Sequence, residues 1–283
     1  MILVADCGGT KADWSLLETN KEDKLVTTPG FNPVVHPPEQ FEDVVGQLSK
    51  DQLPSASPKK IYYYGAGAWD YRRKELIKNT LLQAWPTAEV EVMHDLLGAA
   101  RATCAHEAGI ACILGTGSNS CLYDGKDVVD SVTNLGYLLG DEGSGCHLGK
   151  ALLRAYFYRE LDDELTQSFE QYAQVDRATV RDTVYDSENP NTYLASFTRF
   201  MGEHPDHPLI QDLIYRSFGE FLDRHVRKYE GHLRLPINFI GSIAFHFKEV
   251  LLAAMASRNL RAGRFVPKPI QALADFHRPD LNA

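Results

Sequence analysis

The chain of 283 residues is too long for one small hydrophobic core, and two domains are the expected organisation. Its hydrophobic content of 44% and charged content of 24% are ordinary for a globular protein. The net charge of −9 and the pI near 5.6 argue against a surface for nucleic acid or for an anionic membrane. A small-molecule partner is therefore expected.

The cysteines and the first residues predict the cellular compartment. The apolar run that opens the chain is short and meets Asp6 at once, unlike a signal peptide. No apolar run approaches the length of a membrane span. The five cysteines are odd in number and form no CxxC pair, which favours reduced thiols. We expect a cytoplasmic protein.

Residues 2–18 hold the first candidate ligand-binding stretch. Apolar residues 2–5 lead to Asp6, a turn follows at Gly8-Gly9-Thr10-Lys11, and strand spacing resumes afterwards. Glycines let backbone N–H groups approach a phosphate, and Thr10 and Lys11 add donors. The spacing fits neither a Walker loop nor a Rossmann loop, because this turn opens a second strand. A simple hairpin turn is the alternative.

The remaining pattern alternates strands and helices in the first hundred residues. Strands are predicted at 24–28, 61–64 and 90–93, and helices at 41–48, 71–85 and 96–106. The opening pattern then returns, with strand 110–114, turn Gly115-Thr116-Gly117-Ser118, and strands 121–123 and 128–132. Strand, Gly/Thr turn and strand thus occur twice, about a hundred residues apart, which indicates two halves of one topology.

The rest of the chain is predicted to be mostly helical. Helices are expected at 146–161, 165–172, 178–185, 193–203 and 208–229, followed by strand 235–240 and helix 243–257. Gly241-Ser242 opens the last of these helices. Mixed sheets with helices on their faces are the expected fold class, α/β.

These pieces resemble the sugar-kinase, Hsp70 and actin superfamily. The segment Asp6 to Lys11 looks like its first phosphate loop, Leu114 to Asn119 like its second, and Phe239 to Ala244 like its adenosine motif. The resemblance implies two ribonuclease-H-like domains with an ATP and sugar cleft between them. We place these domains at residues 1–100 and 101–283, and the C-terminal stretch can fold back onto the first.

Within this superfamily the chain resembles the N-acetylglucosamine kinase and BadF/BadG/BcrA/BcrD ATPase family, particularly its short bacterial members. The resembling stretches include Gly30-Phe31-Asn32-Pro33, Tyr64 to Gly67, residues 113–125 and Leu135 to Gly145, so nearly the whole chain is covered. Two departures stand out. Cys7 replaces a frequent glycine or serine, and Asn134-Leu135 replaces a common Gly-Trp pair, which affects the expected shape of the sugar pocket.

The resemblance implies chemical roles for two aspartates. Asp6, at the end of a buried strand, would hold Mg²⁺. A single carboxylate can serve, because Mg²⁺ keeps several waters and uses few carboxylates. The alternative for Asp6 is a carboxylate that caps the turn. Asp95, at a strand-to-helix step, would be the general base that takes the acceptor's proton. Its alternative is an ordinary N-cap of the following helix.

Binding residues follow from the same motifs. The nucleotide contacts would be Gly8, Gly9, Thr10, Lys11, Gly115, Thr116, Gly117, Ser118, Gly241 and Ser242. The sugar contacts would be Asn32, Asp95, Leu135, Gly136 and Asp141, since amides and carboxylates can share ring hydroxyls. The alternatives without ligand binding are turn structure for Asn32 and loop structure for the segment that contains Asp141.

Together these points predict an ATP- and Mg²⁺-dependent kinase that phosphorylates the 6-hydroxyl of N-acetylglucosamine. Glucosamine and N-acetylmuramic acid remain open as acceptors, and a homodimer is compatible with the sequence. One rival is a BadF-type ATPase activator with an iron–sulfur cluster, although no suitable cysteine pairing is recognisable. The other rival is a non-catalytic sugar sensor, and the presence of Asp95 with both phosphate loops argues against it.

Overall fold

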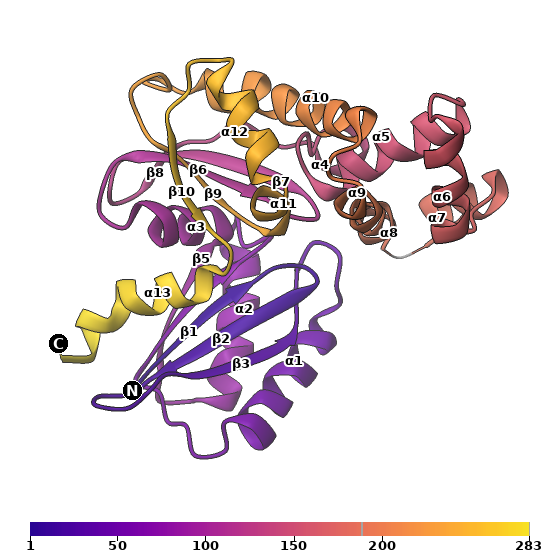
Figure 1. The fold of residues 1–283 in the computed structure, drawn as a ribbon. Coiled ribbons are helices and arrows are strands. Elements are labelled where there is room, and N and C mark those ends of the chain that lie inside the picture. Colours follow the sequence, from indigo (N-terminus) through magenta and orange to yellow (C-terminus); the bar gives the residue numbers. More distant parts are fainter. Residues whose placement is uncertain (188, 283) are drawn as a thin grey trace. The chain divides into compact units, whose positions relative to one another are not determined.

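The computed structural model describes residues 1–187 and 189–282, and over these residues the chain divides into two α/β units (Figure 1). The first unit contains Met1–His106 and the C-terminal segment from Lys268, and the second contains Glu107–Pro267. Each unit is built on a mixed sheet, so the predicted fold class is confirmed. The boundary lies a few residues after the expected end of the first domain at residue 100. The segment from Lys268, for which the sequence left open a return to the first domain, belongs to the first unit.

The first unit is organised around the buried strand β1. Its strands lie in the order β3-β2-β1-β4-β5, with β2 antiparallel and β4 parallel to β1. Their bounds are β1 Ile2–Cys7, β2 Lys11–Leu17, β3 Lys24–Pro29, β4 Lys60–Gly65 and β5 Glu89–His94.

Both faces of β1 are covered, which explains its uninterrupted apolar run. Leu3 and Ala5 belong to the core on one face of the sheet, and Ile2 and Val4 belong to the core on the other. The helices of this unit are α1 Pro38–Gln47, α2 Tyr71–Ala84, α3 Asp95–Cys104 and α13 Pro269–His277, with a π-helical turn at Leu48–Gln52 and a 3₁₀ turn at Arg278–Asn282.

A polar cluster fastens the C-terminal helix to the first sheet. The Tyr64 hydroxyl lies 2.7 Å from Nε2 of His277, and the Tyr62 ring stacks on the His277 ring with centroids 3.6 Å apart. Asp280 accepts a hydrogen bond from the Tyr62 hydroxyl at 2.7 Å and lies 3.2 Å from Nδ1 of His277. Helix α13 and the 3₁₀ turn after it are therefore held against residues of β4.

The second unit repeats the strand order of the first. Its sheet runs β8-β7-β6-β9-β10, with β7 antiparallel and β9 parallel to β6. The strands are β6 Gly109–Leu114, β7 Ser118–Tyr123, β8 Val128–Asp130, β9 Ile237–Ile240 and β10 Ala262–Val266. The repeated topology expected from the two Gly/Thr turns is confirmed.

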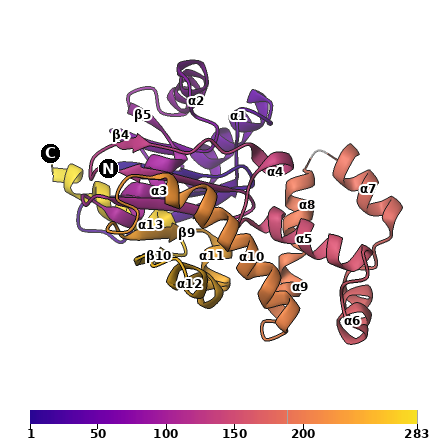
Figure 2. The same ribbon diagram turned by 90° about the horizontal axis from the view of Figure 1, so that it is seen from above.

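A long helical segment between β8 and β9 distinguishes the second unit, and Figure 2 shows α5 to α9 extending to one side of its sheet. The helices of this unit are α4 Gly136–Leu139, α5 Gly145–Phe157, α6 Asp163–Ala173, α7 Arg177–Asp186, α8 Pro190–Ser196, α9 Thr198–Glu203, α10 Pro208–Arg224, α11 Ser242–His246 and α12 Lys248–Ala256.

Some predicted elements were wrong in detail. The helix expected at 193–203 is two helices, because the hydroxyls of Ser196 and Thr198 bond the carbonyls of Tyr193 and Ala195 where α8 meets α9. The helix expected at 243–257 is likewise divided, at Phe247. Strand β10 and helix α13 were missed, and β10 is only partly buried, so its sequence lacks a clear apolar pattern.

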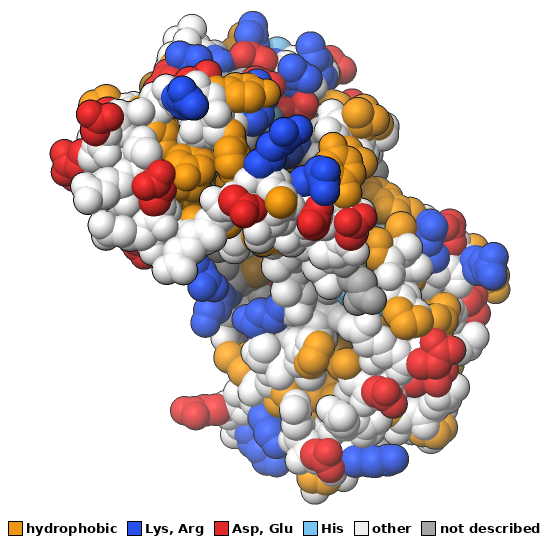
Figure 3. All heavy atoms as spheres, turned by 90° about the vertical axis from the view of Figure 1, so that its right-hand side faces the viewer, with side chains coloured by type: hydrophobic (Ala, Val, Ile, Leu, Met, Phe, Trp, Pro, Cys, Tyr) orange, Lys and Arg blue, Asp and Glu red, His pale blue; other side chains and the backbone are white. Residues whose placement is uncertain are grey.

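No helix among the described residues has both the length and the apolar character needed to cross a membrane. On the face shown in Figure 3, lysine and arginine side chains are interspersed with acidic ones.

The buried His277 should make stability depend on pH. Burial lowers the pKa of His277 from 6.5 to about 4. Between these pH values the unfolded chain binds a proton that the folded protein excludes. The free energy of unfolding should therefore be fully retained above pH 6.5 and fall as the pH drops towards 4, by roughly 2–3 kcal/mol.

Urea unfolding across this pH range checks the effect. His277→Gln should flatten the slope, whereas His246→Gln, at an exposed position, should leave it unchanged. An unaltered slope in the His277 variant would assign the pH dependence to other groups.

Candidate active site

In the first unit, the turn after β1 is joined to the segment that contains Asn32. Gly8 N–H donates to the Lys11 carbonyl at 2.9 Å, which closes the turn. Phe31 N–H donates to the Gly8 carbonyl at 3.1 Å, and Gly30 N–H donates to the Thr10 carbonyl at 3.1 Å. The first candidate phosphate loop is thus braced by the Gly-Phe-Asn-Pro segment.

Asn32 lies beside this turn and is held in one conformation. Its Oδ1 accepts the Val34 N–H at 3.0 Å, and its backbone N–H donates to Nδ1 of His36 at 3.1 Å. Gly67, with φ +75°, packs directly against the Asn32 side chain, so any larger residue would collide with it. A Cβ added to Gly9 would lie 3.8 Å from Cβ of Asn32. The structure therefore brings Asn32 to the first turn.

The surroundings of Asp6 shift the pKa of its carboxyl group. Burial, followed by the negative charges of Asp95 and Asp13, raises the pKa of Asp6 to about 7. Lys11 opposes this shift, but its Nζ lies 2.8 Å from Oδ2 of Asp13 in an exposed pair. The arrangement places carboxylates where a cation would relieve their repulsion.

Asp95 is the first residue of α3, and the helix is capped by its neighbour. Nδ1 of His94 accepts the Leu96 N–H at 3.1 Å, so the interpretation of Asp95 as the N-cap is wrong. Oδ1 of Asp95 lies 2.9 Å from Nδ1 of His94, yet it is buried and accepts no hydrogen bond from the described residues. Trp69, which the sequence did not single out, contacts the His94 ring at a centroid distance of 3.1 Å.

In the second unit, the turn between β6 and β7 is tied to the start of α5. Gly115 N–H donates to the Gly117 carbonyl at 2.9 Å, and Gly145 N–H donates to the Gly115 carbonyl at 2.8 Å. Cys146 N–H donates to the Thr116 carbonyl at 3.0 Å. The Ser118 hydroxyl is buried and has no hydrogen-bond partner in the part of the chain that the structure describes.

The candidate adenosine motif lies against this second turn. Gly241 has φ +106°, and a side chain there would collide with the Leu114 carbonyl, so glycine is required. Ser242 then begins α11. Because β6 and β9 are parallel neighbours, their carboxyl ends bring Gly115 and Gly241 to the same edge of the sheet.

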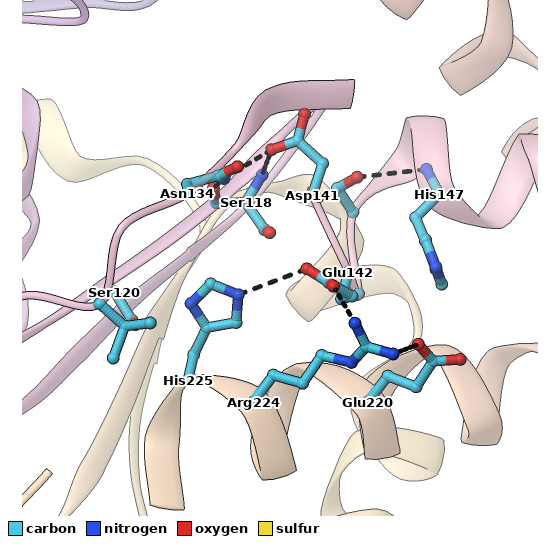
Figure 4. Close-up of polar contacts among 12 residues, drawn as sticks. Ser118, Ser120, Asn134, Asp141, Glu142, His147, Glu220, Arg224 and His225 are labelled. Carbon is cyan, nitrogen blue, oxygen red and sulfur yellow. Dashed lines mark hydrogen bonds and ion pairs between the residues drawn. The ribbon is translucent and has the colours of Figure 1, made fainter. Parts of the chain in front are cut away.

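Asp141 holds the second turn through its carboxylate (Figure 4). Oδ1 accepts the Ser118 N–H at 2.9 Å and a hydrogen bond from Nδ2 of Asn134 at 2.7 Å. Oδ2 lies 3.6 Å from Sγ of Cys146 and points away from Ser118. Asp141 is buried, with φ +59°, whereas Leu135 and Gly136 at the start of α4 are exposed. The structure thus joins Gly136, Asp141 and Ser118 in one region of the second unit.

The polar contacts of the buried Glu142, next to Asp141, were not predicted. Glu142 lies 3.1 Å from Nη1 of Arg224 and 3.4 Å from Nε2 of His225 (Figure 4). The acidic pair Asp141-Glu142 was visible in the sequence. Its basic partners lie some eighty positions later, so no local pattern could connect them.

The repeated topology and the turn at the end of each first strand define a two-domain fold of the actin-like ATPase superfamily, which includes sugar kinases. A glucokinase of the ROK family from Streptomyces griseus, solved with glucose and AMPPNP, shares this fold with a TM-score of 0.61 and 14% identity over 94% of this chain and 93% of that one. A ROK hexokinase from Thermus thermophilus gives 0.56 and 16% over 93% and 91%.

A much stronger similarity shows the family. A Porphyromonas gingivalis protein named "Putative N-acetylglucosamine Kinase" is 36% identical over 99% of both chains, with a TM-score of 0.90. A protein of the same printed name from Chromobacterium violaceum gives a TM-score of 0.75 at 17% identity, over 97% of this chain and 98% of that one. No protein-family model and no curated protein matches the chain. The chain belongs to the N-acetylglucosamine kinase family.

The backbone contact at Gly30 should be intolerant of any side chain. A Cβ there would overlap the Gly8 carbonyl and the Lys11 nitrogen and lie 2.8 Å from the Thr10 carbonyl carbon. These are backbone atoms, so Gly30→Ala must displace the first turn. It should lower the free energy of unfolding by about 1–3 kcal/mol, as measured by urea titration.

Gly46 offers a matched control, because a Cβ there would meet nothing within 4 Å. Since Gly46 lies inside α1, Gly46→Ala should stabilise the protein by about 0.5–1 kcal/mol. Equal effects of the two substitutions would show that the first turn tolerates displacement.

Proposed function

We propose that this protein transfers the γ-phosphoryl group of ATP to the 6-hydroxyl of N-acetylglucosamine. The proposal rests on the similarity to the P. gingivalis protein named "Putative N-acetylglucosamine Kinase", which is 36% identical over 99% of both chains. A neighbour of the same fold was solved with glucose and AMPPNP, which supports a sugar and a nucleotide as the ligand classes.

ATP would be bound by backbone-rich turns in both units. Phosphoryl transfer needs positioned donors around the phosphates more than covalent chemistry. The residues proposed for this task are Gly8, Gly9, Thr10 and Lys11 in the first unit, and Gly115, Thr116, Gly117, Ser118, Gly241 and Ser242 in the second. The unpartnered hydroxyl of Ser118 adds a donor at the second turn.

Asp95 would be the general base. A base needs a carboxylate oxygen that is free to accept a proton from the acceptor hydroxyl. The Asp95 side chain is 24% exposed while its Oδ1 is buried beside His94, so the other carboxylate oxygen would take the proton. Its position at the start of α3 fixes the carboxylate by the helix geometry rather than by a flexible loop.

Mg²⁺ fits the carboxylates at the end of β1. The raised pKa of Asp6, caused by burial and then by Asp95, marks negative charge that a divalent cation would stabilise. Among the described residues there is no cluster of three or more His, Cys, Asp or Glu that could form an all-protein cage. Mg²⁺ characteristically binds through one or two carboxylates, waters and substrate phosphates, so Asp6 would hold it. The ion would neutralise phosphate charge.

The sugar would be contacted by Asn32, Asp95, Leu135, Gly136 and Asp141. Asp141 can serve two tasks, since Oδ1 holds the second turn and Oδ2 points away from Ser118. A carboxylate accepts hydrogen bonds from sugar hydroxyls, which agrees with the proposed acceptor class.

The cysteines disfavour the rival ATPase activator. A cluster that bridges subunits needs thiolates at the surface, whereas Cys7, Cys104, Cys112, Cys121 and Cys146 are all buried. Burial also raises the pKa of Cys7 to about 12 and that of Cys146 to about 12, so these thiols stay protonated.

A substrate panel tests the proposal and separates it from a non-catalytic sensor. N-acetylglucosamine, glucosamine, N-acetylmuramic acid and glucose are each incubated with ATP and Mg²⁺, while ADP release and the phosphorylated position are followed. N-acetylglucosamine 6-phosphate is the expected main product. Binding of the sugar without ADP release would indicate a sensor.

Asp95→Asn should separate catalysis from nucleotide binding. The amide keeps the volume of the side chain but cannot take up the proton, so the single-turnover rate should fall at least ~10²-fold. The affinity for ATP, measured by calorimetry, should change little. Asp43→Asn, on the exposed face of α1, is the matched control and should keep full activity. A normal rate in the Asp95 variant would remove this residue from the mechanism.

A further inference from the structure

The side chain of Asn134 is fully engaged in hydrogen bonds within the second unit. Its Nδ2 donates to Oδ1 of Asp141 at 2.7 Å and to the Ser118 carbonyl. Its Oδ1 accepts the Gly136 N–H at 2.6 Å. One amide group therefore links the start of β7, the start of α4 and the buried carboxylate. Figure 4 shows Asn134 beside Ser118 and Asp141.

The chemistry of these contacts requires an amide. Two N–H groups must face acceptors while an oxygen on the same planar group faces a donor, and a primary amide provides this combination. A glycine at this place would provide none of it. The side chain of Asn134 therefore supplies hydrogen bonds that a glycine at the same position would leave to water or to other groups.

The surroundings leave this position little freedom. A Cβ added to Gly117 would lie 3.0 Å from Oδ1 and 3.1 Å from Oδ2 of Asp141, so the carboxylate sits directly against the second turn. A Cβ added to Gly140 would lie 3.1 Å from Oδ1 of Asn134. Within the segment from Asn134 to Asp141, Gly140 thus lies against the Asn134 side chain and Asp141 lies against Gly117. The segment cannot shift without moving the turn that begins at Gly115.

We propose that Asn134 is a positioning residue that fixes the second phosphate turn and the sugar-contact turn to each other. The inference rests on the proposed function, because it takes Ser118 as a nucleotide contact and Gly136 and Asp141 as sugar contacts. Asn134 acts through these residues and does not touch a substrate. Its loss should therefore weaken both ligands together.

Asn134→Ala tests this proposal. The dissociation constant of a non-hydrolysable ATP analogue and that of N-acetylglucosamine, each measured by calorimetry, should both rise about tenfold, as expected when buried hydrogen bonds are lost. The KM values for ATP and sugar should rise by a similar factor, with a smaller change in kcat, because Asp95 and Asp6 are untouched. Asn79→Ala, at an exposed position on α2, is the control and should leave all these constants unchanged.

Asn134→Asp gives a second readout that a merely structural role would not produce. The new carboxylate would face Asp141, and two carboxylates in contact share a proton more readily as the pH falls. The other titratable groups at this place are Cys146, whose pKa burial raises to about 12, and Lys150, which acts on that thiol. Analogue binding by this variant should recover severalfold between pH 7.5 and pH 5.5, with no such gain in the unsubstituted protein.

The outcomes distinguish the inference from the proposed function. If no amino sugar is phosphorylated by the unsubstituted protein, the proposed function fails, and analogue binding by the Asn134 variants still tests the positioning role. If Asn134→Ala lowers the melting temperature but binds both ligands normally, the inference is wrong. If Asn134→Ala does not fold, pH-independent binding by Asn134→Asp overturns it.

Discussion

The close approach of backbone to backbone at the ends of β1 and β6 is the constraint on which both units depend. In the first unit, Gly30 leaves room for the Gly8 carbonyl, and in the second, Gly241 leaves room for the Leu114 carbonyl. A side chain at either position would separate a turn from the segment that braces it. Carbonyl and amide groups bound in this way hold both turns, and in the second unit the side chains of Asp141 and Asn134 add further hydrogen bonds. Turns held in this way suit the proposed presentation of N–H groups to phosphate.

The sequence predicted those features whose cause is local. The apolar run of β1, the glycines after it and the repeat of this pattern at β6 each depend on neighbouring residues, so the fold class and the paired topology could be inferred. Helix α13 could not, because its placement depends on contacts with distant residues such as Tyr64. Strand β10 could not either, because it is only partly buried and lacks a clear apolar pattern. The divided helices were missed for a related reason, since hydroxyls at Ser196 and Thr198 compete with the helical hydrogen bonds.

The same difference between local and long-range causes applies to the residues of the candidate site. The sequence placed Asp95 at a strand-to-helix step. It did not reveal that His94 is the N-cap of α3, because histidine is an uncommon N-cap residue. For Asp141 the sequence suggested a sugar contact or plain loop structure. The hydrogen bond that its carboxylate accepts from Ser118, more than twenty positions earlier, was not expected. The partners of Glu142 are more distant still, and hydrogen bonds of this range have no local signature.

The chain leaves its first unit after His106 and returns to it at Lys268, and this order has a consequence for synthesis on the ribosome. Ile2, Val4 and Leu17 share a core with Ile270, Leu273 and Ala274, which are made only after the second unit. Until they emerge, one face of the first sheet lacks part of its apolar cover. The first unit therefore cannot complete this core before the second unit has been synthesised, and until then the nascent chain carries an aggregation-prone surface.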